Sequence, residues 1–195
     1  PRFLIVLIPF FLITGPFLSD LALSIVALIF LIKNYLNKLK KFYNNIYFKI
    51  FILFWVILII SSLLSDNILI SLKNSFFYFL FEIFTLCFWF LIEKNEKILD
   101  YVFFSLLFCF LILIIDGYAQ YILGKNLFGW ELYNKFRVSS FFGSELILGS
   151  YLSRLFPILF GLFIYIDKKK RSKKLMFLVT SIFILSEGLI FLSGE

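Results

Sequence analysis

The sequence predicts an all-α, polytopic helical membrane protein with about seven transmembrane helices. Apolar residues make up 62% of the 195 residues, and 30 residues are phenylalanine, whereas a soluble globular domain is nearer half apolar. Several apolar runs approach the roughly 20 residues that a membrane-spanning helix requires. The runs are continuous and do not alternate with a period of two, which indicates helices rather than the strands of a barrel.

The segments follow one another along the chain with short polar connections. Gly15-Pro16 ends the first run, because Gly and Pro interrupt helices, and Ser19 or Asp20 is a candidate cap for the second. A Gly- and aromatic-rich stretch follows the fifth run, and a short interfacial helix is expected at 117–123. The predicted spans are 3–14, 17–32, 50–64, 75–92, 101–115, 145–166 and 175–192.

The distribution of lysine and arginine predicts the orientation of these spans. The N-terminal end and the loops 33–49, 93–100 and 167–174 hold 14 of the 19 basic residues, whereas the alternate loops and the C-terminal end hold four. Because basic residues concentrate on the cytoplasmic side, the first set is predicted to be cytoplasmic. The longest loop, about 116–144, is then predicted to face outward. The net charge of +7 is explained by this pattern, so no nucleic-acid partner is expected.

The ends of the sequence suggest a piece of a longer protein. The chain begins at Pro1 without a methionine and stops three residues after an apolar run. We therefore treat residues 1–195 as a single transmembrane domain within a longer protein. A site completed by further residues would be only partly visible in this chain, and the fragment is expected to be inactive alone.

The stretch from Arg137 to Pro157 contains the main candidate residues. Arg137 lies on the predicted outer side. It is either an anchor that faces the lipid headgroups or a ligand for phosphate, which arginine binds through bidentate hydrogen bonds. The residues Ser139, Ser140, Gly143 and Ser144 come between Arg137 and the predicted start of a helix at Glu145. Backbone N–H groups at such a start attract anions, while Glu145 either satisfies the helix dipole or acts as an acid or base.

Arg154 is the second candidate because it lies within the predicted sixth span. A charge at that depth costs several kcal/mol unless it is paired or faces water. It is either paired with Glu187 or Glu82 or part of a polar cavity. Pro157, three residues on, is expected to loosen the helix there.

Asp116 and Gln120 are further candidates for substrate binding, with helix capping as the alternative. They are spaced i, i+4 and would share a face of the expected interfacial helix. The chain has no histidine, and its two cysteines lie inside apolar runs. No metal site, cofactor or nucleophile motif is predicted, and no catalytic residue is assigned.

Three segments, DGYAQYILGKNLFG (116–129), RVSSFFGSELILGSYLSRLFP (137–157) and LSGE (192–195), carry a family resemblance. Together they resemble the O-antigen ligase and O-antigen polymerase superfamily of bacterial inner-membrane proteins. Its members have an outward arginine, a glycine-bearing turn that opens a helix, a proline that ends the first half of this helix, and a later S-G-x-R stretch. The corresponding elements here are Arg137, Phe142-Gly143, Gly149, Pro157 and Ser193-Gly194, with Glu195 in place of the family's last arginine.

The resemblance implies glycan transfer from an undecaprenyl-diphosphate-linked oligosaccharide at the periplasmic face of the inner membrane. The acceptor would be lipid A-core for a ligase or a growing glycan for a polymerase, and the resemblance does not separate the two. It implies that Arg137 holds the diphosphate and that Arg154 contacts or structures the same cavity, without metal or nucleotide.

Two other classes of function compete with this interpretation. A secondary transporter or flippase would use the intramembrane Arg and Glu residues at a helix broken near Pro157, but it should show internal repeats, and none is visible. A structural or anchoring subunit would have no reason to keep Arg154 inside a span.

Overall fold

A computed structural model of the chain describes residues 2–37, 40–133 and 136–194. The described part is helical, with one long loop, and confirms the predicted all-α fold class. Lys38 and Lys135, which enter the charge count, lie outside the described residues, as does Glu195. The elements in chain order are α1 (Arg2–Thr14), α2 (Pro16–Asn37), α3 (Lys40–Tyr43), α4 (Ile46–Leu63), α5 (Ile68–Lys94), α6 (Lys97–Leu123), the 3₁₀ turn η1 (Ser140–Phe142), α7 (Leu148–Lys170) and α8 (Lys173–Ser193).

Six of these helices, α2 and α4–α8, are long and apolar enough to cross a membrane. The chain is therefore a multi-pass membrane protein. The helix α1 is also apolar but has only 13 residues, or about 20 Å at the rise of an α-helix. The 13 residues of α1 are fewer than the roughly 20 that cross a hydrocarbon core of about 30 Å.

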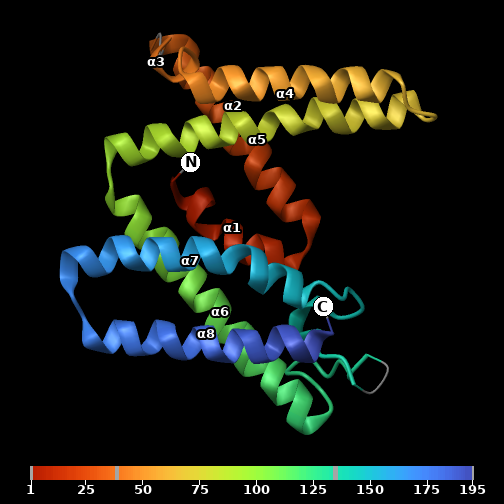
Figure 1. Cartoon of the computed structure of the whole chain (residues 1–195), viewed down its shortest axis with the longest axis vertical. Coiled ribbons are helices and arrows are strands. Elements are labelled where there is room, and N and C mark those ends of the chain that lie inside the picture. Colours follow the sequence, from red (N-terminus) through yellow and green to blue (C-terminus); the bar gives the residue numbers. More distant parts are fainter. Residues whose placement is uncertain (1, 38–39, 134–135, 195) are drawn as a thin grey trace. The chain divides into compact units, whose positions relative to one another are not determined.

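The chain divides into two compact units. The first comprises Pro1–Ile8 and Ser19–Glu96, and the second comprises Pro9–Leu18 and Lys97–Glu195. In the first unit, α4 and α5 form the antiparallel hairpin that Figure 1 shows in orange to yellow-green. The indole N–H of Trp55 donates to the carbonyl of Ser75 at 2.9 Å, and the Trp55 ring lies 5.0 Å from that of Phe79. These contacts fix the pairing of two helices that are otherwise largely apolar.

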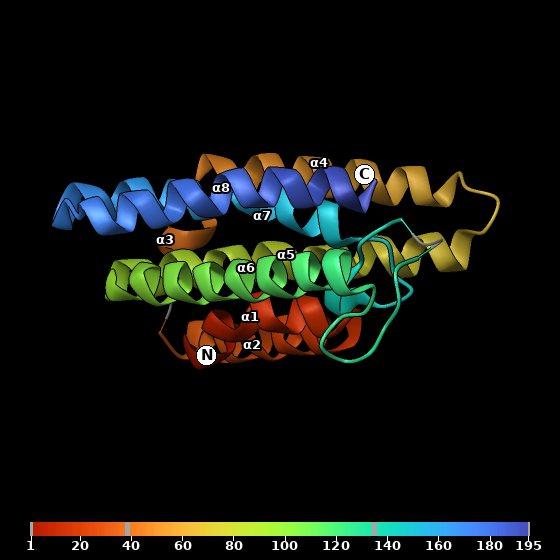
Figure 2. The ribbon, with the colours of Figure 1, turned by 90° about the horizontal axis from the view of Figure 1, so that it is seen from below.

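In the second unit, α6, α7 and α8 pack on one another, and Figures 1 and 2 show α7 and α8 side by side as a hairpin. Glycines let α6 and α8 approach closely. A Cβ at Gly117 of α6 would lie 2.9 Å from a methyl carbon of Leu189 on α8, and a Cβ at Gly188 of α8 would collide with the Tyr118 hydroxyl. Small residues at helix interfaces are how membrane helices pack in the absence of a hydrophobic driving force between them.

Two predicted boundaries near the long loop are wrong. No break separates a fifth span at Ile115 from an interfacial helix, because α6 continues unbroken to Leu123. Asp116 and Gln120 do not end the helix because both side chains find hydrogen-bond partners in the loop. The sixth span begins at Leu148, and Glu145 precedes it, since the preceding residues form the 3₁₀ turn and a tight turn.

Candidate functional site

The two ends of the second unit differ in charge. At one end, the start of α6 and the turn between α7 and α8 are rich in basic residues. These are Lys97, Lys168, Lys169, Lys170, Arg171, Lys173 and Lys174. At the other end lie the loop 124–147 and the end of α8, which Figures 1 and 2 both show beside each other. The described charges of the loop, Lys125, Arg137, Glu131 and Glu145, are two of each sign, whereas the other end is strongly basic.

Asp116 attaches the loop to the last turns of α6. Its side chain is fully buried, and each carboxylate oxygen accepts one hydrogen bond. Oδ1 accepts from the backbone N–H of Leu127 at 2.9 Å, and Oδ2 accepts from the Ser140 hydroxyl at 2.6 Å. A buried carboxylate is tolerated only with such partners, so Asp116 fixes two distant points of the loop against one helix.

Gln120, one helical turn later, uses both ends of its amide in the same way. Its Oε1 accepts from the backbone N–H groups of Ser139 and Ser140 at 3.0 and 2.8 Å. Its Nε2 lies 3.3 Å from the carbonyl oxygens of Trp130 and Glu131, to which it donates. The side chain is completely buried. Gln120 thus joins the two arms of the loop.

Asn126 closes the loop on itself. Its Oδ1 accepts from the backbone N–H groups of Phe128 and Trp130 at 3.0 and 2.8 Å, and its Nδ2 donates to the Ser140 carbonyl at 3.0 Å. Asparagine side chains commonly replace backbone partners in turns. Sequence reasoning missed Asn126, although its position between Gly124 and Gly129 is a turn signal.

Arg137 ties the loop to the end of α8. Its Nε donates to the Ser193 carbonyl at 2.7 Å and its Nη2 to the Gly194 carbonyl at 3.2 Å. The backbone N–H of Val138 adds a bond to the Leu192 carbonyl at 3.1 Å. The last carbonyls of a helix have no partner within it, and a cation is favourable there. Arg137 therefore caps α8.

Gly194 allows this cap to form. Its φ is +71°, and a Cβ on it would lie 2.9 Å from Nε of Arg137. Any other residue would be strained in this backbone conformation and would displace the guanidinium. A guanidinium has five N–H donors, and the described contacts of Arg137 use two of them. The remaining donors are available for an anion.

A groove of about 540 Å³ opens on the same loop. Its lining residues are Trp130, Glu131, Leu132, Tyr133, Phe142, Gly143 and Ser144. The backbones of Tyr133 and Arg137 exchange hydrogen bonds of 3.1 and 3.0 Å, so Arg137 is attached directly to the wall of the groove. Trp130 and Tyr133 are exposed. The groove combines aromatic faces with a carboxylate and a hydroxyl.

The serines around η1 do not form the anion site that the sequence suggested. The N–H groups of Ser139 and Ser140 are already bonded to Gln120, and the helix begins only at Leu148. Glu145 lies exposed in the connection before α7 rather than in a first helical turn. Its own backbone N–H donates to the Phe142 carbonyl at 3.0 Å.

Arg154 lies apart from this network. It is exposed on α7, six residues after Leu148 and so about 9 Å along the helix. Within the second unit's described residues it has no ion pair with Glu187. A long arginine side chain at this depth can reach the membrane interface. The helix α7 continues through Pro157 to Lys170, so the predicted loosening at the proline does not interrupt it.

The structure thus brings Asp116, Gln120 and Arg137 together around the loop, while Glu145 and Arg154 lie outside their hydrogen-bond network. Whether any of the five contacts a substrate stays a prediction. In the described part of the chain, no group of His, Cys, Asp and Glu side chains is placed to hold a metal ion. Comparison with known proteins adds no assignment, since no family model, curated protein or solved structure matches the chain at a significant level.

Proposed function

We propose that the chain belongs to a bacterial inner-membrane glycosyltransferase of the O-antigen ligase or polymerase type. The single observation that carries the proposal is the position of Arg137. Its guanidinium is held by the carbonyls of Ser193 and Gly194, and its described contacts leave other N–H donors unused. Its backbone is bonded to that of Tyr133, which lines an open aromatic groove. The loop lies at the end of the unit away from the basic turns, which fits an outward, periplasmic orientation.

The chemistry of glycan transfer fits such a place. In transfer from undecaprenyl diphosphate, an acceptor hydroxyl forms the new bond to the sugar and loses its proton to solvent. The bond between the sugar and the diphosphate breaks, and the diphosphate leaves with the negative charge. A cation that is already oriented stabilises this charge without reorganisation. Arg137 is oriented by α8 and can offer its free N–H groups to phosphate oxygens. The lipid tail stays in the bilayer, so the site must lie where helices meet the membrane surface, and a loop at the ends of α6 and α8 fits that requirement.

The groove supplies surfaces that suit a sugar. The aromatic faces of Trp130 and Tyr133 can pack on the apolar C–H face of a pyranose ring, while Glu131 and Ser144 offer partners for hydroxyl groups. The salt bridge between Lys125 and Glu131, at 3.1 Å, orients the carboxylate at the rim. The acceptor, lipid A-core or a growing glycan, would approach from the open side.

The transporter alternative has less support. It requires a helix that is interrupted at mid-membrane to expose backbone groups to the substrate. The helix α7 carries Arg154 and Pro157 but is continuous from Leu148 to Lys170. No described feature of α7 therefore favours transport over transfer.

The proposal is tested in the host by deleting the full-length gene and analysing lipopolysaccharide on a gel. Loss of the long-chain ladder to core alone indicates a ligase, and core with one repeat indicates a polymerase. Arg137→Ala in the complementing gene should fail to restore the ladder, and Arg137→Lys should restore it in part, because it keeps the charge but not the planar donor fork. Lys174→Ala is the matched control, a cation at the start of α8 that lies outside the loop, and should complement fully.

The amount of tagged protein in the membrane fraction separates loss of chemistry from loss of folding, because Arg137 also caps α8. An unchanged ladder in the deletion strain contradicts the glycan-polymer function. Full complementation by Arg137→Ala removes Arg137 from the mechanism.

A further inference from the structure

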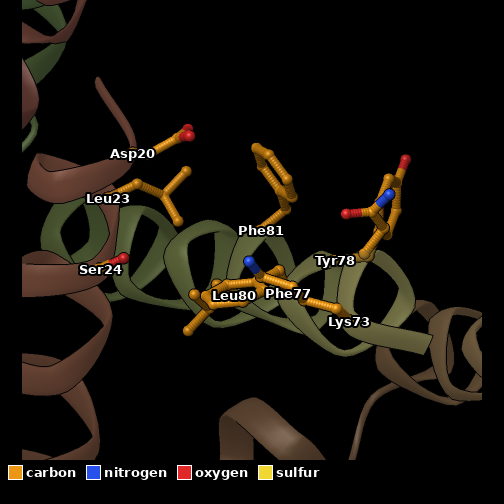
Figure 3. Close-up of a pocket in the computed structure, with 9 residues that line it drawn as sticks. Asp20, Leu23, Ser24, Lys73, Phe77, Tyr78, Leu80 and Phe81 are labelled. Atoms are coloured by element: carbon orange, nitrogen blue, oxygen red, sulfur yellow. The ribbon is translucent and has the colours of Figure 1, made fainter. Parts of the chain in front are cut away.

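A second cavity lies in the first unit, between α2 and α5. It has a volume of about 390 Å³ and is lined by Asp20, Leu23, Ser24, Lys73, Asn74, Phe77, Tyr78, Leu80 and Phe81. Figure 3 shows Asp20, Leu23 and Ser24 entering it from α2, and the other labelled side chains entering from α5. None of these residues takes part in the loop network or the aromatic groove described above.

The cavity carries two opposite charges that do not neutralise each other. Asp20 and Lys73 are both exposed and both line the cavity, yet no ion pair joins them within the described residues. Neither side chain has a hydrogen-bond partner in the described part of the chain. A charged side chain near apolar walls binds a ligand group of opposite charge favourably when that group replaces the water around the side chain. The cavity therefore offers one anion-binding and one cation-binding point.

The remaining walls are apolar and aromatic. Leu23, Phe77, Leu80 and Phe81 provide four of the nine lining residues, and the rings of Tyr78 and Phe81 lie 5.4 Å apart at 53°. Aromatic faces attract a cation electrostatically, and apolar walls accommodate acyl chains. The Tyr78 hydroxyl and the Asn74 amide add polar groups to the lining.

The position along the helices suits the headgroup level of a membrane. The helix α5 has 27 residues, or about 40 Å, which matches a bilayer including its headgroup regions. Lys73 comes five residues after the start of α5 at Ile68, and Asp20 comes four residues after the start of α2 at Pro16. Both charges thus lie within about 8 Å of a helix start, where headgroups and acyl chains meet.

We propose that this cavity binds a zwitterionic phospholipid whose headgroup carries a phosphate and a primary ammonium. The Lys73 ammonium pairs with the lipid phosphate, and the Asp20 carboxylate accepts hydrogen bonds from the lipid ammonium beside the Phe81 ring. An anionic lipid without an ammonium satisfies Lys73 but leaves Asp20 facing negative charge. The two unpaired protein charges therefore select a headgroup that contains both signs. This binding site is independent of the proposed glycan transfer.

The test is native mass spectrometry of the purified full-length protein, with phosphatidylethanolamine or phosphatidylglycerol added in detergent. We expect the wild type to retain phosphatidylethanolamine several-fold better than phosphatidylglycerol. Asp20→Asn should bring this ratio close to one, because it removes the ammonium partner. Lys73→Gln should lower the retention of both lipids, because both carry the phosphate. Asp66→Asn and Lys125→Gln, which change charges outside the cavity, are the matched controls and should behave as wild type.

Helical content by circular dichroism and elution as a single peak establish that each variant is folded. Equal retention of the two lipids by the wild type overturns the proposal without any variant, and so does a preference for phosphatidylglycerol. An unchanged ratio in folded Asp20→Asn also overturns it, since the carboxylate would then have no part in selection. The double variant Asp20→Lys with Lys73→Asp keeps both charges and should recover part of the preference for phosphatidylethanolamine.

Discussion

The helices α4 and α6 are both strongly apolar, yet they have very different surroundings. Only 6% of the α4 span is buried within the protein, whereas 50% of the α6 span is buried. The helix α6 packs against α7, α8 and η1, and α4 packs mainly against α5. Mean hydropathy therefore predicts that both segments cross the membrane, but it does not predict which one becomes the core of a unit.

The arrangement of small and polar residues accounts for the difference. In α6 the residues Ser105, Cys109, Leu113 and Gly117 recur every fourth position, and all four are buried, as expected for a helix face that lets neighbouring backbones approach. Between Ile46 and Ile60, α4 has only large side chains. Its contact with α5 depends on Trp55 and, at its end, on the hydroxyl of Ser62, which bonds to that of Ser75. The large side chains of α4 pack well against lipid, but they keep the backbones of neighbouring helices apart.

The same substitution in the two helices tests this comparison most directly. Leu113 on α6 is fully buried, while Leu53 on α4 is 64% exposed. Leu113→Ala should lower the free energy of unfolding by about 3–5 kcal/mol, because it leaves a cavity among packed helices. Leu53→Ala should change it by less than about 0.5 kcal/mol, as expected at an exposed site. Equal losses in denaturant unfolding of the purified protein would contradict the difference between the helices.

The next largest expected effect on stability comes from replacing Asp116, near the polar end of α6. Asp116→Ala removes the acceptor of the part-buried Leu127 N–H and of the buried Ser140 hydroxyl, and leaves a cavity in place of a fully buried side chain. Leaving these donors without partners should cost about 2–4 kcal/mol. The loss should be local at first, so proteolysis of the loop 124–147 should accelerate more than global unfolding. If the cleavage rate does not change, Asp116 does not hold the loop.

Two adjacent serines beside the end of α6 give the smallest expected effect on stability. Ser139 and Ser140 are both fully buried, but only the Ser140 hydroxyl donates to Asp116; in the described structure that of Ser139 has no partner. Ser140→Ala should lower the melting temperature, because losing a hydrogen bond to a charged group lowers the free energy of unfolding by about 1–2 kcal/mol. Ser139→Ala should leave it unchanged or raise it slightly, because it removes an unpaired buried polar group. The reverse order in thermal unfolding would show that the hydroxyls are bonded otherwise.

Part of the candidate site was predictable from sequence. Arg137 was identified by its predicted outward position and by the suitability of arginine for phosphate. In the structure its backbone is bonded to Tyr133 of the groove wall, and Asp116 and Gln120 of α6 hold the same loop. The prediction that Asp116 and Gln120 share a helix face is confirmed, although the helix is the end of a long span rather than a separate one. Asn126 and the groove residues Trp130 and Tyr133 were not identified as site residues, because their roles arise from contacts between distant parts of the loop.

The sequence by itself determined that this is a helical multi-pass membrane protein. A bilayer accepts only segments that satisfy their own backbone hydrogen bonds, so length and apolarity are sufficient to find them. Only the tertiary structure decided what the polar residues near the membrane do. Asp116 and Gln120 looked like the end of a span because their partners, Leu127, Ser139 and Ser140, follow 11 to 24 residues later. The cost of burying a polar group depends on where its partner lies in space, and the linear pattern of residues does not contain that distance.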